Sequence, residues 1–123
     1  MYNYINTNQT TNITDDVQVE HIMPKVGTSW FSANLISRDE HNRLKERLGN
    51  KTLLTPIKNT ILSNKIYSEK LRYYKEQNIA LTNQDLNQID KKFSVTYYNE
   101  WNEKSIDERQ LALAKIAKDI WGF

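Results

Sequence analysis

The 123-residue chain contains no cysteine, and glycine, proline and histidine are all scarce. Without cysteine it can form no disulfide, thiolate zinc site or iron–sulfur cluster, and it has no cysteine nucleophile. No apolar run approaches the ~20 residues that span a bilayer. The N-terminus also lacks the basic segment and apolar core of a signal peptide. These absences exclude disulfide-stabilised and thiolate-metal proteins and favour a cytoplasmic location without a membrane partner.

Several common catalytic and nucleotide-binding motifs are also missing. The sequence has neither Gly-x-x-x-x-Gly-Lys-Ser/Thr nor Gly-x-Gly-x-x-Gly, so folds that hold a nucleotide on such loops lose support. No Gly-x-Ser-x-Gly elbow supports a serine hydrolase. His21 and His41 are the only histidines, which disfavours a zinc site built purely from His and Cys.

The composition is that of one small folded domain. Apolar residues make up 38% of the chain and aromatic residues 11%, enough for a modest core. The first residues are rich in Asn and Thr, and we expect residues 1–16 to be a flexible arm or the end of a linker. In the second case the chain would be a fragment of a longer protein. Residues 17–123 then form the folded domain.

The net charge of +2 is unevenly distributed along the chain. Residues 21–79 contain eleven Lys or Arg against five Asp or Glu, whereas residues 1–20 and 80–123 are both net negative. A basic middle segment is typical either of a polyanion-binding surface or of an ordinary solvated one.

Two short stretches have the pattern of β-strands. Val17 and Val19 alternate with polar residues, and Pro24 tends to end strand pairing. Residues 50–55 are β-prone and are followed by Pro56. We expect the two stretches to pair as a small antiparallel β-hairpin.

Helix signals surround these strands. Ser37 to Glu40 has the form of a capping box and predicts a helix to Leu48, with Gly49 as its left-handed C-terminal residue. Further helices are predicted over 68–77, near 82–85 and after a second capping box, Ser105 to Glu108. The predicted fold class is α+β: mainly helical, with a two-stranded antiparallel β-hairpin and a following helix.

The strand ends carry the residues best suited to chemistry. Glu20 and His21 lie on the first strand, and Asn50 and Asn59 flank the second. Neighbouring strand residues point to opposite faces, so Glu20 and His21 share a site only if the strand ends or twists there, as Pro24 suggests. Carboxylate and amide oxygens suit Mg²⁺, and a neutral imidazole suits proton transfer near neutral pH. Together they describe metal-assisted phosphodiester hydrolysis.

Several motifs of the sequence, taken in order, resemble those of a known family. Glu-His-Ile-x-Pro at 20–24, Leu-Gly-Asn-x-Thr-Leu-Leu at 48–54 and Asn59 resemble the HNH nucleases, also called His-Me finger or ββα-metal nucleases. More narrowly, the chain is similar to the C-terminal nuclease domain of GmrSD-type modification-dependent restriction enzymes. The likeness runs from 17 to 121. Residues outside the site that share the familiar order are Trp30, Ser63, Asn64, Lys70, Tyr74, Trp101, Ile106, Arg109, Ile120 and Trp121.

The resemblance implies a role for each candidate residue. His21 matches the general base that activates the attacking water, and Glu20 and Asn59 match metal-binding positions. Asn50 matches an Asn that either orients the histidine or braces the turn. Many HNH sites have Asp at the position of Glu20, and the extra methylene would allow ligation through water.

The implied function is a Mg²⁺- or Mn²⁺-dependent DNA endonuclease domain, the nuclease part of a restriction or anti-phage defence enzyme. The resemblance also implies an N-terminal nucleotide-hydrolysing sensor domain in the same or a partner chain. A non-cleaving nucleic-acid or protein-binding module on the same scaffold, and an RNase with the same site, are the alternatives. The candidate DNA-phosphate contacts are Lys51, Lys58, Lys65, Lys70 and Arg72.

Other residues carry two interpretations each. His41 fits packing or a third metal ligand, and Asn59 fits helix capping as well as metal binding. The three tryptophans fit a core better than a stacking surface for bases. Arg109, in the first turn of the predicted last helix, fits either a buried pairing or a phosphate contact, because its charge opposes the helix dipole there.

Overall fold

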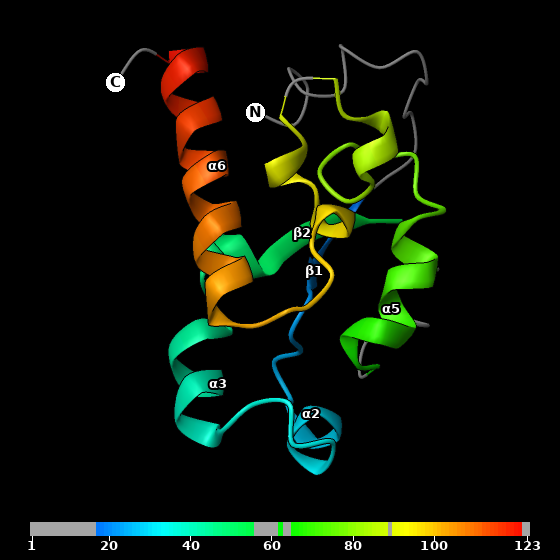
Figure 1. The fold of residues 1–123 in the computed structure, drawn as a ribbon, viewed down its shortest axis with the longest axis vertical. Helices are drawn as coiled ribbons and strands as arrows, with labels where there is room; N and C mark the ends of the chain where they lie inside the picture. The colour runs from blue at the N-terminus through cyan, green and yellow to red at the C-terminus, as the bar shows by residue number, and fades with distance from the viewer. Residues whose placement is uncertain (1–16, 56–61, 63–64, 89, 122–123) are drawn as a thin grey trace.

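The computed structural model describes residues 17–55, 62, 65–88 and 90–121, and within them the predicted α+β class is confirmed. Strand β1, Gln18–His21, pairs antiparallel with β2, Lys51–Leu54, and His21 lies opposite Lys51 in the register. Helices surround this short sheet (Figure 1). The two strands are joined not by a tight turn but by residues 22–50, which contain two helices.

The inward face of β1 is the reverse of what the alternation of valines suggests. Val19 is 56% exposed, whereas the Glu20 side chain points inward and is only 3% exposed. Its cross-strand neighbour Thr52 is also buried. The charged residue is accepted inside because the interior holds partners for its carboxylate, which are described below.

The helices between the strands are α2, Thr28–Ser32, and α3, Arg38–Leu44. The capping box at the start of α3 is confirmed, since the Ser37 hydroxyl accepts from the Glu40 N–H and the Glu40 carboxylate accepts from the Ser37 N–H. The helix ends four residues before the predicted end. A 3₁₀ turn, η1, Leu48–Asn50, follows it.

Gly49 is required by close packing, and its prediction as a left-handed helix terminus is wrong. It lies inside η1, and its φ is not in the left-handed range. A Cβ atom placed on Gly49 would lie 2.2 Å from the backbone oxygen of Ile106. The glycine therefore allows the segment that leads into β2 to approach the last helix closely.

The second half of the chain holds α5, Tyr67–Tyr74, and α6, Glu103–Trp121. Between them lie three 3₁₀ turns: η2, Gln84–Leu86; η3, Lys91–Phe93; and η4, Val95–Tyr97. Helix α6 begins two residues before the predicted Ser105, and the Asn102 side chain accepts from the Ser105 N–H at 3.1 Å. Asn102, rather than Ser105, is the cap.

Two apolar clusters form the core of the part of the chain that the structure describes. The larger one includes Ile22, Met23, Trp30, Leu54, Tyr74 and Trp101. The smaller one joins α6, through Leu113 and Ile116, to residues 79–81 and Phe93. Trp30 and Trp101 are thus core residues, as their size suggested. Within the part of the chain that the structure describes, no helix combines the length and apolar character of a membrane crossing.

Arg109 joins several segments from inside the protein. Its fully buried guanidinium donates to the backbone carbonyls of Gly49, Lys51, Leu81 and Phe93. Burial lowers the pKa of Arg109 to about 10, and nearby tyrosines oppose this effect. A phosphate contact by Arg109 does not agree with this burial. The buried pairing does agree, and its partners are backbone carbonyls.

Replacing Arg109 by methionine is expected to lower the free energy of unfolding by about 3 kcal/mol, because buried carbonyls would lose their donors. Urea denaturation followed by circular dichroism measures the change. The exposed Arg72 gives a matched control, since Arg72→Met should change stability by less than about 0.5 kcal/mol. Equal stability of the two variants would contradict the structural role of Arg109.

Candidate functional site

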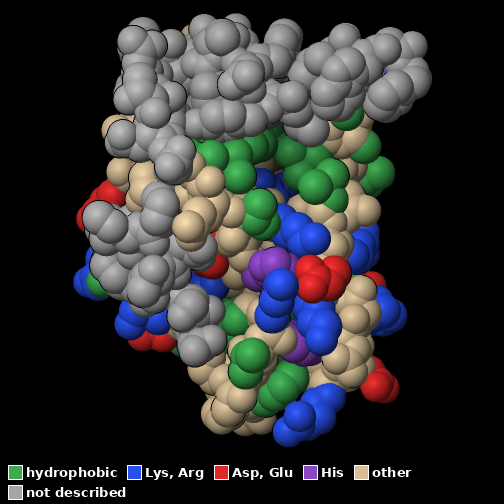
Figure 2. All heavy atoms as spheres, turned by 180° about the vertical axis from the view of Figure 1, so that it is seen from behind, with side chains coloured by type: hydrophobic (Ala, Val, Ile, Leu, Met, Phe, Trp, Pro, Cys, Tyr) green, Lys and Arg blue, Asp and Glu red, His purple; other side chains and the backbone are tan. Residues whose placement is uncertain are grey.

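His21 is the last residue of β1, and its ring is partly exposed. The side chain is 15% exposed, and its Nε2 lies 2.7 Å from Oε1 of Glu46, in the segment between α3 and η1. The ammonium of Lys51, across the ladder from His21, lies 3.4 Å from the same oxygen. Figure 2 shows a face of the molecule where histidine, basic and acidic side chains lie together.

The Glu46 carboxylate is held in its ionised form. Its pKa lies below the ordinary value of 4.5, first because of the hydrogen bond with His21 and further because of Lys51 and Lys25 nearby. Desolvation raises the pKa of Glu46; this effect is smaller than that of the hydrogen bond with His21 but larger than those of the two lysines. The site at the end of β1 therefore combines an imidazole, a carboxylate and ammonium groups on the surface.

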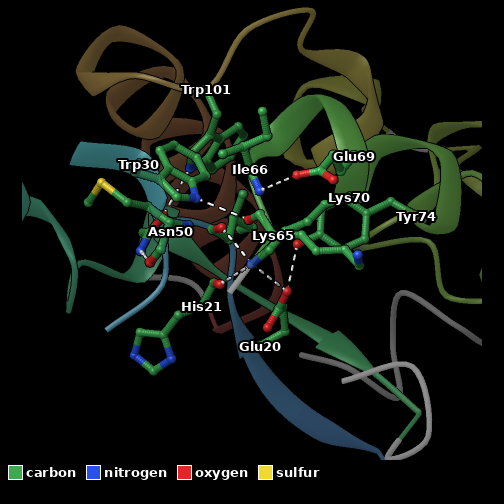
Figure 3. A network of polar contacts seen from close by, with 12 residues as sticks. Glu20, His21, Trp30, Asn50, Lys65, Ile66, Glu69, Lys70, Tyr74 and Trp101 are labelled. Carbon is green, nitrogen blue, oxygen red and sulfur yellow. Dashed lines mark hydrogen bonds and ion pairs between the residues drawn. The ribbon is translucent and has the colours of Figure 1, made fainter. Parts of the chain in front are cut away.

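The Glu20 side chain points away from His21 and into the protein (Figure 3). Its Oε2 accepts from the Lys70 ammonium at 2.9 Å and from the Tyr74 hydroxyl at 2.7 Å. Both partners come from α5 and are fully buried. Burial, and then the Glu20 charge, raise the pKa of Tyr74 well above its ordinary value, so its hydroxyl remains a donor.

Lys70 also holds the end of β1 through the main chain. Its ammonium donates to the carbonyls of His21 at 3.0 Å and Ile22 at 2.8 Å, as well as to Glu20. Burial lowers the pKa of Lys70, and the Glu20 carboxylate opposes that shift. The three donors of this ammonium thus have three acceptors inside the protein.

Two of the sequence predictions therefore need correction. Lys70 cannot reach a DNA phosphate from the interior, because the side chain is 0% exposed and its donors are occupied. Glu20 does not fit a metal ligand, because its buried carboxylate is bound to an ammonium that would repel a cation. Both residues instead fix the strand that presents His21.

Asn50 braces the chain just beyond β1. Its Oδ1 accepts from the Met23 N–H and from Nε1–H of Trp101, both at 2.9 Å. Its Nδ2 donates to the carbonyls of Met23 and Lys45, also at 2.9 Å. The side chain is fully buried and all these bonds are made away from the His21 ring. Of the two roles weighed for Asn50, bracing the turn agrees with this geometry.

The other candidates differ in how far the structure describes them. Asn59 and Lys58 lie outside the described residues. Lys51 and Lys65 are half-buried, and Arg72 is exposed with its guanidinium over the Tyr73 ring. His41 is buried, with Nε2 2.7 Å from the Pro24 carbonyl, so it packs inside and makes no third metal ligand.

The described residues include no cluster of acidic and histidine side chains of the kind that binds a metal. Among them, no three His, Cys, Asp or Glu side chains converge as metal ligands would. Glu20 faces Lys70, as described above, while the amide of Asn59 would supply a hard oxygen of the kind that Mg²⁺ prefers. The site as described is thus a partly exposed imidazole on a strand end that is fixed from inside.

Two features of the site have no signal in the sequence. The contact between His21 and Glu46 joins residues 25 positions apart, and the bond from Lys70 to Glu20 joins residues 50 apart. Neither spacing follows from the period of a helix or strand. Only the tertiary packing of α5 and of the segment after α3 brings these pairs together.

Comparison with known proteins adds a family to this geometry. A family model described as the C-terminal domain of GmrSD restriction endonucleases matches residues 1–116, and the chain therefore belongs to this family. Restriction endonucleases act on DNA, so DNA is the substrate class of the enzymes to which such domains belong. No curated protein and no solved structure matches the chain.

Proposed function

We propose that this chain is a divalent-metal-dependent endonuclease domain of the HNH type that hydrolyses DNA phosphodiester bonds. The observation that carries the proposal is the position of His21. Its imidazole is partly exposed on the last residue of β1, beside Lys51, while Lys70 and Asn50 fix the backbone around it. Membership of a family of restriction endonuclease domains supports the endonuclease part of the proposal.

The chemistry assigned to His21 is general base catalysis. The imidazole accepts a proton from water while the water oxygen attacks phosphorus, and the bond from phosphorus to one ester oxygen breaks. A neutral imidazole suits this role near neutral pH. Because the end of β1 is fixed, the imidazole needs little reorientation before it accepts the proton, and this favours proton transfer.

Mg²⁺ or Mn²⁺ would supply charge stabilisation at the phosphate when bound. Asn59 is the proposed protein ligand, on the strength of the family resemblance and of its amide oxygen. Glu20 has no part in this set. It acts through Lys70 and the backbone of β1 instead.

The proposed DNA contacts are the basic residues that the sequence indicated, other than Lys70. Lys51 lies beside the imidazole, and Lys65 and Arg72 lie before and on α5. Lys58 is proposed from its position in the basic middle segment. Phosphate contacts of this kind position the duplex but do not read its base sequence. Target choice would therefore come from an N-terminal sensor domain. The whole would be a restriction or anti-phage defence enzyme that acts in the cytoplasm.

A non-cleaving binding module is the second candidate. The observation that favours it is the state of Glu20, whose carboxylate is bound to Lys70 instead of facing the surface. Such a module would keep the surface lysines and bind DNA through them. It would need no metal and no proton transfer by His21.

Incubation of the chain with supercoiled plasmid separates the two functions. The nuclease should nick the plasmid in Mg²⁺ or Mn²⁺ and stop when EDTA removes the ion. An RNA substrate in the same buffer tests the RNase alternative. Retention of DNA in a gel shift without cutting in either metal would overturn the nuclease proposal and support the module.

A further inference from the structure

Glu46 makes the one described contact to the side chain of His21 that could set the orientation of its ring. The carboxylate Oε1 lies 2.7 Å from Nε2, a short distance typical of a charge-assisted hydrogen bond. Glu46 comes from the segment between α3 and η1, and no motif identified in the sequence includes it.

The chemistry of this contact determines which nitrogen carries the proton. Glu46 is ionised at neutral pH, since its pKa is below the ordinary value, and an ionised carboxylate can only accept hydrogen bonds. Nε2 of a neutral His21 must therefore be the donor. The lone pair then lies on Nδ1, which becomes the basic nitrogen of the ring.

We propose that Glu46 is a positioning residue for His21: it binds Nε2–H, fixes the tautomer and ring orientation, and leaves Nδ1 to accept the proton from water. The inference rests on the proposed function, in which His21 is the general base. Glu46 touches no reacting atom and acts only through the imidazole.

The surroundings of Glu46 give this role a distinctive kinetic signature. The carboxylate lies 3.4 Å from the Lys51 ammonium and is also influenced by Lys25, so it reduces the positive charge available to DNA. Removing it should strengthen DNA binding and slow the chemical step. Loss of a residue that only supported the fold would not lower kcat while it left DNA binding the same or tighter.

Glu46→Ala is expected to lower kcat for plasmid nicking about 10- to 100-fold, as loss of a partner that orients a histidine does at metal sites. KM should stay the same or fall. Glu46→Gln keeps an acceptor oxygen and should give an intermediate kcat. Asp85→Asn removes one exposed carboxylate from η2 and is the charge-matched control, with kcat unchanged.

A second measurement does not depend on cutting. Long-range ¹⁵N–¹H spectra report the tautomer of each histidine, and His21→Ala identifies the signals of the two that the chain contains. His21 should be protonated on Nε2 in the wild type and become a mixture of tautomers in Glu46→Ala. His41, which must donate Nε2–H to the Pro24 carbonyl, should not change.

The outcomes separate the inference from the function on which it rests. If the wild type cuts DNA and both Glu46 variants cut with unchanged kcat, the inference is overturned and the nuclease proposal stands. If the wild type does not cut, the proposed function fails, and an unchanged His21 tautomer in Glu46→Ala then overturns the orienting contact as well.

Discussion

Replacement of His21 by alanine is expected to lower the rate of DNA cleavage by a factor of about 10²–10⁴, the range that a positioned general base contributes. The side chain is partly exposed, its ring is hydrogen-bonded to Glu46, and the backbone of β1 is fixed by other residues. The fold should therefore remain intact. Initial rates of plasmid nicking, with thermal unfolding measured on the same sample, test both parts.

His41→Gln is the matched control for this prediction. His41 is buried and bonds to the Pro24 carbonyl, so its loss should affect stability while the cleavage rate per folded molecule stays the same. A His21→Ala protein that is folded and cuts as fast as the wild type would exclude His21 as the base. Loss of DNA binding together with cleavage would point to a binding role instead.

Lys70→Met should lower the free energy of unfolding by about 3–5 kcal/mol, since it leaves the buried carboxylate of Glu20 without its cation. It also removes the donors to the carbonyls of His21 and Ile22. For a domain whose total stability is about 5–15 kcal/mol, this is a large fraction. Chemical denaturation of the wild type and the variant gives the difference directly.

Lys75→Met, at the exposed end of the same helix, is the control and should change stability by less than about 0.5 kcal/mol. The double variant Glu20→Gln with Lys70→Met removes both charges and should recover part of the loss, because no unpaired carboxylate then remains inside. A Lys70→Met protein as stable as the control would contradict the buried ion pair.

The parts of the fold that depend on local signals could be predicted from the sequence. The capping box at Ser37 needs only two side chains three residues apart, and it is present as expected. The pairing of two short β-prone stretches was also predictable, because few other segments of the chain could form strands. The order of motifs likewise indicated the family that the comparison shows.

The parts that depend on tertiary contacts were not predictable in the same way. Alternation of Val17 and Val19 with polar residues predicted the strand, but it did not show that a lysine from α5 pairs with Glu20 and holds the Glu20 side chain inside. Gly49 has the position of a helix terminus in the sequence, yet the structure needs a glycine there because a Cβ atom would collide with the backbone of Ile106. Local patterns contain no information about either partner.

The same limit applies to the site. The sequence made His21 and Asn50 candidates, and it gave Lys70 the role of a surface cation because a lysine in a polar helix is usually solvated. Glu46 was absent from the candidates because its contact with His21 spans 25 positions and follows no motif. Residues that act through another residue have no spacing rule of their own.

The guanidinium of Arg109 also links the assembly of the site to the order in which the chain is made. Two strands of four residues are too short to be stable alone, and the start of the second is bound by an arginine located near the C-terminus. A ribosome releases β1 long before it has translated α6. An incomplete nascent chain that lacks α6 therefore also lacks the guanidinium donors that bind the start of β2.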